Sequence, residues 1–240
     1  GDTESDGLML EGMFACVSNV SFDPKAIAAL ERRVRAKAIS LGEFSSYDMD
    51  LLWDAQEDIR SLKSLLLFGM RGVAAYAYHA QALGKSDPVV TAFLYEGMRA
   101  VGSDLGMDEL LPLVLKCGEV NLAAMAALEE ANVSTYGKPE PATVELGVEA
   151  GPFIVVTGHD LHDLKQLLEQ TEGRGVNVYT HGEMLPANAY PELRKYPHLK
   201  GNYGTAWHNQ RKEFKDLPAP ILWTTNCLLK PDESYADRVF

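Results

Sequence analysis

Residues 151–183 have the sequence GPFIVVTGHDLHDLKQLLEQTEGRGVNVYTHGE. Two runs in this stretch, 153–157 and 176–180, are rich in β-branched and aromatic residues, which is typical of strands buried in a sheet. Between the runs, residues 161–172 place leucines at helical spacing. Strand, helix and strand in this order predict a βαβ unit with a right-handed crossover.

A third apolar run, 221–225, follows the second after a long irregular connection over 186–220. A connection of this length inside a compact domain is usually functional, and we expect a short helix within it at 207–214. The sequence therefore predicts that residues 151–240 form a partial α/β domain, Rossmann-like, with a mostly parallel sheet of three strands.

Each predicted strand ends directly before a group that can bind metal: Gly158-His159-Asp160, His181-Gly182-Glu183 and Asn226-Cys227. In an open parallel sheet, ligands bind in the crevice beyond the carboxyl ends of the strands. His159 would supply a nitrogen, Glu183 an oxygen and Cys227 a sulfur, a mixed donor set that suits iron or zinc. The neighbouring groups could orient these ligands or donate protons; they are Asp160, His181 and Asn226.

Each of these residues also has an ordinary structural interpretation. A lone cysteine after an apolar strand is often a small buried hydrophobic residue, and His159 could cap the following helix. Glu183 could lie at a helix start, where the helix dipole favours a carboxylate. Two other functions remain open: a cysteine-dependent enzyme in which His159 or His181 is the base for Cys227, and a metal-free interaction domain.

The sequence before residue 150 has a helical period instead. Apolar residues recur at helical spacing in four segments, which cover 23–42, 47–84, 87–101 and 108–132. Short connections between them predict a helical bundle. Residues 8–20 are expected to form an extended N-terminal segment, and 134–150, with two prolines and two glycines, to contain the domain boundary. The predicted domains are therefore 1–150 and 151–240.

The composition disfavours several classes of function. With 22 Lys and Arg against 34 Asp and Glu, the net charge is −12, which disfavours nucleic-acid binding because that requires a basic face. No uninterrupted apolar run approaches the roughly 18 residues of a spanning helix, so no membrane contact is expected. Three widely spaced cysteines, Cys16, Cys117 and Cys227, predict a reducing compartment, and we expect a cytoplasmic location.

Several motifs resemble those of the hybrid-cluster proteins, the hydroxylamine reductases. They are GHDL at 158–161, QTEG at 170–173, THGEMLP at 180–186 and TTNC at 224–227, with LKCGEVN at 115–121 further upstream. The likeness covers nearly all of the chain beyond the first dozen or so residues. The THGEMLP and TTNC motifs in this order are highly specific.

The resemblance implies a helical first domain followed by α/β domains. It also implies that His159, Glu183 and Cys227 are three ligands of an iron–sulfur–oxygen hybrid cluster of the four-iron type. The implied activity is that of an oxidoreductase acting on a small nitrogen-containing substrate, reducing hydroxylamine to ammonia or carrying out related chemistry with nitric oxide. The redox partner protein that would supply electrons is not identified by the resemblance.

The chain departs from the family pattern in two respects. The family's amino-terminal cysteine cluster has no counterpart in residues 1–240, and its later cluster ligands and carboxyl-terminal domain would lie beyond Phe240. We therefore expect an internal fragment that is inactive alone and binds one metal ion weakly or none, because its three donors cannot replace a thiolate-rich set. A three-stranded sheet should also leave an edge unpaired, which an oligomer or the remainder of the enzyme would cover.

Overall fold

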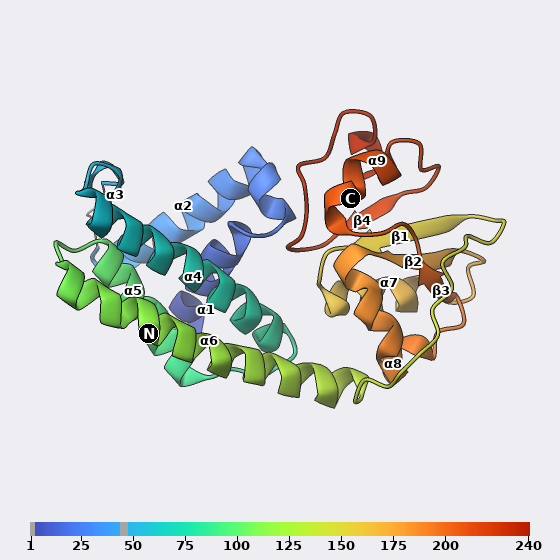
Figure 1. Cartoon of the computed structure of the whole chain (residues 1–240), viewed down its shortest axis with the longest axis horizontal. Coiled ribbons are helices and arrows are strands. Elements are labelled where there is room, and N and C mark those ends of the chain that lie inside the picture. Colours follow the sequence, from blue (N-terminus) through green and yellow to red (C-terminus); the bar gives the residue numbers. More distant parts are fainter. Residues whose placement is uncertain (1–2, 44–47) are drawn as a thin grey trace. The chain divides into compact units, whose positions relative to one another are not determined.

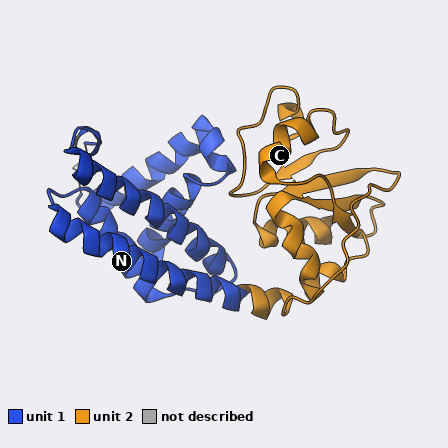
Figure 2. Ribbon diagram, viewed as in Figure 1, with its two compact units in different colours: residues 1–131 blue, residues 132–240 orange. Residues whose placement is uncertain are grey.

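The computed structural model describes residues 3–43 and 48–240 and divides into two compact units, Gly1–Ala131 and Asn132–Phe240 (Figure 2). The first unit is helical, and the second contains a parallel sheet. The predicted fold class, a helical bundle followed by a partial α/β domain, is therefore confirmed.

Residues 137–150 belong to the sheet-containing unit rather than to the helices. The Glu140 N–H donates to the Ala189 carbonyl (2.9 Å), and the Glu149 N–H donates to the Tyr179 hydroxyl (2.9 Å). These bonds attach the segment to the sheet unit. The helical unit consequently ends before the boundary expected at residue 150.

The helices of the first unit run nearly the length of the segments that the periodicity marked (Figure 1). They are α1 (Thr3–Ala15), η1 (Asn19–Phe22), α2 (Pro24–Ser40), α3 (Asp50–Trp53), α4 (Glu57–Ala82), α5 (Pro88–Val101) and α6 (Met107–Tyr136), of which α6 continues across the division between the units. Asp23 caps α2 by accepting from two backbone N–H groups of the first turn, and Asp87 caps α5 by accepting from one. A proline follows each cap at the first helical position, as the sequence predicts.

The extended N-terminal segment expected over 8–20 is wrong, because most of it lies in α1 and η1. Residues 4–15 contain no β-branched residue and are rich in strong helix formers such as Leu, Met and Glu. Leu10 and Met13 of α1 are buried in the core of the unit. Tertiary packing and intrinsic propensity therefore agree on a helix at this position.

The helix predicted over 47–84 is interrupted. After α3, the Gln56 side chain caps α4 by accepting from the N–H groups of Asp58 (3.0 Å) and Ile59 (3.2 Å). This capping bond stabilises a new helix start that the apolar spacing alone does not show. The predicted beginning of the segment at Tyr47 lies outside the described residues.

The core of the helical unit is apolar and closely packed. Leu66 and Met70 of α4 and Leu94 of α5 are fully buried. A Cβ at Gly69 would lie 2.9 Å from the Cys117 sulfur, so α4 and α6 approach closely there. The missing side chain of Gly69 thus leaves room for this close crossing.

Helix α6 is, among the described residues, the one helix whose length and composition would allow it to cross a membrane. Its sequence has no uninterrupted apolar run of spanning length, because charged residues occur along it. One face of α6 packs into the helical core through Cys117, Val120 and Ala124, all of them buried.

The second unit is built around four parallel strands in the order β3-β2-β1-β4 (Figure 1). Its elements are β1 (Phe153–Thr157), α7 (Leu161–Thr171), β2 (Asn177–His181), η2 (Gly182–Ala189), α8 (Pro191–Arg194), β3 (Leu199–Asn202), η3 (Trp207–Asn209), α9 (Gln210–Phe214), β4 (Ile221–Trp223) and η4 (Ala236–Arg238). The chain proceeds outward from β1 to β3 and then returns to the other side of β1. The strand order therefore reverses between β1 and β4, the position at which open α/β sheets bind ligands.

The sheet has four strands among the described residues, not the three expected. The additional strand, β3, has the sequence LKGN and contains one large apolar residue, so it lacks the pattern of a buried strand. The helix expected at 207–214 is confirmed as η3 followed by α9.

The outer edges of the sheet are partly covered by the chain itself. Beyond β3, Glu145 forms a bridge with Gly201, and beyond β4, Val239 forms a bridge with Ile221. The expectation of an unpaired edge is thus wrong where these bridges form. An oligomer or a further part of the enzyme at this sheet remains a prediction.

Candidate metal-binding site

The end of β1 is held against the end of β4 by a close backbone approach. Gly158 has a φ of 104°, and a Cβ there would lie 2.2 Å from the Thr224 hydroxyl oxygen and 2.6 Å from the Thr225 nitrogen. The Thr224 hydroxyl and N–H both donate to the Thr157 carbonyl, at 2.7 and 3.0 Å. Glycine is therefore required at position 158 both for its backbone angle and for space.

The loop after β4 has an unusual backbone. Asn226 and Cys227 both have positive φ, 52° and 47°. Two consecutive residues other than glycine in this region are strained, at a cost of about 1–3 kcal/mol each, and asparagine tolerates it better than most. Such strain persists where the surrounding structure holds it in place, and it directs the Cys227 side chain back toward the end of β1.

This geometry brings two of the three predicted ligands into contact. The His159 Nε2 atom lies 3.1 Å from the Cys227 sulfur. The histidine is exposed and the cysteine partly buried, so the pair lies at an accessible edge of the sheet. Residues 68 positions apart in the sequence thus meet at the reversal of strand order.

Glu183, the third predicted ligand, begins the turn after β2 and is exposed. The surrounding protein raises the pKa of the Cys227 thiol, and the Glu183 carboxylate raises it further. Desolvation lowers the pKa of the His159 imidazole, an effect that the same carboxylate opposes. Glu183 is therefore near enough to act electrostatically on both partners. Both shifts favour a neutral thiol that donates to a neutral imidazole, unless a cation is bound.

His181 is fully buried and belongs to a different hydrogen-bond network. Its Nδ1 lies 3.0 Å from the Thr157 hydroxyl, and its Nε2 lies 2.8 Å from the Glu213 carboxylate. Desolvation lowers the pKa of His181, opposed by the hydrogen bond to Glu213. Since both ring nitrogens are engaged, His181 has none left to pair with the Cys227 thiol.

The remaining two predicted site residues support the local backbone. Asp160 caps α7, its carboxylate accepting from the N–H groups of His162 (2.8 Å) and Asp163 (3.2 Å). Asn226 lies in the strained turn directly before Cys227. The helix-cap interpretation offered for His159 thus applies to its neighbour Asp160 instead.

The donor set fits part of a multi-iron group. His159 and Cys227 place a nitrogen donor and a sulfur donor in contact at one accessible edge, and imidazole and thiolate are both known cluster ligands. Within residues 3–43 and 48–240, no three His, Cys, Asp or Glu side chains are arranged to hold a single metal ion. A cluster spreads its irons over several ångströms, so its ligands need not converge on one point as those of a single ion must.

Sequence reasoning did not identify Gln210, which contacts the site from α9. Its side chain is completely buried and donates to the Cys227 carbonyl at 2.9 Å. Gln210 lies in a polar stretch, HNQRKEF, whose composition indicates a solvated helix. The length of the connection around it was the available signal.

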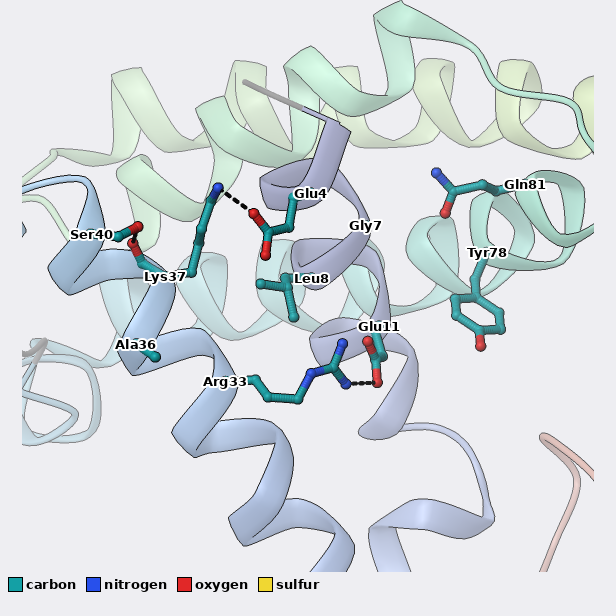
Figure 3. A pocket seen from close by; sticks show the side chains of 10 residues that line it. All are labelled: Glu4, Gly7, Leu8, Glu11, Arg33, Ala36, Lys37, Ser40, Tyr78 and Gln81. Atoms are coloured by element: carbon teal, nitrogen blue, oxygen red, sulfur yellow. Dashed lines mark hydrogen bonds and ion pairs between the residues drawn. The ribbon is translucent and has the colours of Figure 1, made fainter.

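The helical unit has a polar cavity of about 650 Å³, which is lined by residues of α1, α2 and α4 (Figure 3). Two ion pairs connect the walls: Lys37 to Glu4 (2.7 Å) and Arg33 to Glu11 (2.6 Å). These ion pairs join α1 to α2. Each charged side chain that is described in the cavity lining is paired, so none of them remains to select a charged ligand.

A helical unit followed by an open parallel sheet, with metal-binding side chains at the reversal of strand order, defines the class of protein: an α/β protein with a candidate metal centre. The sequence matches the model of the Prismane/CO dehydrogenase family over residues 2–240, and the chain belongs to this family.

Its relatives include proteins named hydroxylamine reductase. That of Solidesulfovibrio magneticus is 48% identical, with 99% of this chain and 49% of the relative aligned. That of Maridesulfovibrio salexigens is 45% identical over 99% of this chain and 48% of its own length. That of Moorella thermoacetica is 55% identical over 77% of this chain and 44% of its own length. The chain thus spans about half the length of the curated relatives it matches.

Proposed function

We propose that this chain forms part of a hydroxylamine reductase and supplies three ligands, His159, Glu183 and Cys227, to its iron–sulfur–oxygen hybrid cluster. Family membership implies such a cluster in the full-length proteins. The names of the relatives support an oxidoreductase that reduces hydroxylamine. The observation that carries the proposal is the 3.1 Å contact between His159 Nε2 and the Cys227 sulfur at the reversal of strand order.

The reaction takes up two electrons and two protons, breaks the N–O bond of hydroxylamine, and releases ammonia and water. The cluster, when bound, would supply the electrons and an open coordination position for the substrate. His159 and Cys227 would hold it at the ends of β1 and β4, and Glu183 would add an oxygen donor from β2. The proposal includes nitric oxide as a second substrate of the same site.

This chain would hold only one side of the cluster. One imidazole, one carboxylate and one thiolate are fewer and harder donors than multi-iron clusters usually have. We therefore propose that the isolated chain is inactive and that further ligands come from protein outside residues 1–240. The proposal also includes a redox partner protein as the electron donor. It includes a cytoplasmic location as well, which the sparse cysteines support.

Cobalt(II) provides a test of the ligands in the isolated chain, because a cobalt–thiolate bond gives an intense near-ultraviolet absorption band. Because a partial site should bind a single ion only weakly, we expect this band at high cobalt concentration, and its loss in Cys227→Ser. Binding should weaken by about 10- to 100-fold in His159→Ala and less in Glu183→Gln.

Two exposed residues provide matched controls: Cys16→Ser and His208→Ala should leave the band unchanged. Retention of the band in Cys227→Ser would refute the proposed site. Reconstitution with iron and sulfide tests the proposal of a partial site separately. Stoichiometric binding of several irons with acid-labile sulfide in the isolated chain would contradict it.

A cysteine-dependent enzyme is the second candidate, and the contact between Cys227 and His159 is what favours it. Such an enzyme requires a thiolate at neutral pH, usually through a lowered thiol pKa. The surroundings of Cys227 raise its thiol pKa instead. Rapid alkylation of Cys227 at pH 7 in a metal-free sample, lost in His159→Ala, would favour this candidate over the metal site.

A further inference from the structure

Gln210 opens helix α9 and contacts three separate segments around the candidate site. Its side chain is completely buried. The amide nitrogen donates to the Cys227 carbonyl (2.9 Å) and to the Thr157 hydroxyl (3.3 Å), and the amide oxygen accepts from the Leu229 N–H (2.9 Å). Both amide hydrogens and the amide oxygen are therefore used.

The pairing with the Cys227 loop has a specific form. The carbonyl of residue 227 and the N–H of residue 229 are two positions apart, and the Gln210 amide bonds both of them. One residue of a neighbouring parallel strand, through its own N–H and C=O, would make the same two bonds. Gln210 thus substitutes for a paired strand at a point where β4 has ended and the chain turns through the strained Asn226 and Cys227.

A hydrogen-bond chain fixes which way the Gln210 amide faces. The Glu213 carboxylate accepts from His181 Nε2, so His181 Nδ1 accepts from the Thr157 hydroxyl. The Thr157 oxygen is then free to accept from the amide nitrogen of Gln210. The nitrogen end of the amide consequently faces Thr157 and the Cys227 carbonyl, and the oxygen end faces the Leu229 N–H.

We infer that Gln210 is a positioning residue for Cys227, which holds the strained loop so that the sulfur stays against His159 Nε2. The inference rests on the proposed function insofar as this sulfur is a cluster ligand. A shorter asparagine would not reach across from α9, and a glutamate would lose both donors and bury a charge. Methionine keeps the length and removes every hydrogen bond.

The test compares Gln210→Met with Asn202→Met. Asn202 is also buried, lies in the same unit at the end of β3, and makes hydrogen bonds to Thr180 and to backbone carbonyls of the next loop. Both variants should lower the urea midpoint of unfolding. Two further readouts separate positioning from stability: the cobalt affinity of the chain, and the alkylation rate of Cys227 in the metal-free chain, followed by peptide mass spectrometry.

We expect Gln210→Met to weaken cobalt binding by about 10- to 100-fold and to change the Cys227 alkylation rate, with Asn202→Met leaving both unchanged. In a His159→Ala background, Gln210→Met should no longer change the alkylation rate, since the contact it maintains is already lost. If Gln210→Met does not fold, Gln210→Asn should show the same pattern.

Equal changes in Gln210→Met and Asn202→Met, or a change in the urea midpoint alone, would overturn the inference. Failure of the wild-type chain to bind cobalt through Cys227 would refute the proposed metal site instead. The alkylation measurements require no metal and would still decide the role of Gln210.

Discussion

The helical unit and the sheet unit bury different kinds of side chain. Of the ten described buried polar or charged side chains, eight belong to residues 132–240, and two, Ser18 and Lys63, belong to the helical unit. The helical core is held by interlocking apolar groups such as Leu66 and Leu94. At the carboxyl ends of the strands, loops are held by directional hydrogen bonds, because apolar packing alone does not fix where a loop points. A polar interior thus marks the part of this molecule where the positions of loop side chains are fixed.

Gly158→Ala should have the largest effect and should be confined to the sheet unit. The new Cβ would overlap the Thr224 hydroxyl and the Thr225 backbone, at a position with φ of 104°. We expect a loss of about 3–5 kcal/mol of stability, from steric overlap together with backbone strain. Urea unfolding followed by the fluorescence of buried Trp223 measures it.

Gly173→Ala is the matched control, since its φ is also positive, 70°, but nothing lies within 4 Å of the added Cβ. It should cost only the backbone strain. Equal losses of stability in the two glycine variants would show that the close backbone approach at the ends of β1 and β4 does not contribute to the cost of Gly158→Ala.

Leu94→Ala should destabilise the helical unit by about 3 kcal/mol, because it leaves a cavity in a closely packed apolar core. The reactivity of Cys227 in the sheet unit should not change. Circular dichroism under urea and Cys227 alkylation measure the two effects. Leu122→Ala, at a side chain 67% exposed, should change stability by no more than about 0.5 kcal/mol. A change in Cys227 alkylation by Leu94→Ala would mean that the units are coupled.

Thr157→Val tests whether the polar interior of the sheet unit depends on its hydrogen bonds. The change keeps the shape but removes the hydroxyl that joins His181 to Gln210. We expect a loss of about 1–3 kcal/mol, because a buried ring nitrogen is left without its partner. Thr143→Val, at an exposed position of the same unit, should be close to neutral in the same urea titration. If Thr157→Val leaves the free energy of unfolding unchanged, packing rather than hydrogen bonding stabilises this edge of the sheet.

Asp163→Asn should give the smallest effect, and its sign is opposite. Burial, and then the nearby Asp160 carboxylate, raise the pKa of Asp163 to about 6. Because the folded state binds this proton more tightly than the unfolded state, Asp163 lowers stability progressively as the pH rises from its unfolded pKa toward its folded pKa. The variant should be more stable than the wild type by about 1 kcal/mol at pH 7.5, after allowance for solvent screening, and by less at pH 5. Equal gains at both pH values would show that Asp163 does not titrate in this range.

The sequence predicted the parts of the fold that depend on strong local patterns. The run at 153–157 is β1, and the helix expected at 161–172 is α7 with one residue fewer. It did not predict β3, because LKGN has no apolar alternation and forms a strand through its pairing with β2, which is distant from any local pattern. The start of α4 was likewise missed, since it depends on a side-chain cap by Gln56 rather than on apolar spacing.

The candidate site could be predicted in outline because parallel strands place their carboxyl ends at one edge. That rule selected His159 and Cys227, which the structure brings into contact. The rule could not show that His181, at the end of the neighbouring strand β2, lies outside the site. Its ring instead contacts Glu213 in the interior. Gln210 was missed because its contacts are made to backbone groups distant in sequence, which composition does not reveal.

The strand order also has a consequence for folding. β1 and β2 are neighbours joined by one helix, so they can pair after a short loop closes. β4 pairs with β1 only after the whole of residues 158–220 has been brought back, which costs more chain entropy and slows the step. The contact between His159 and Cys227 joins the ends of β1 and β4, and therefore closes the longest loop between paired strands of this sheet. We expect it to form after β1 has paired with β2.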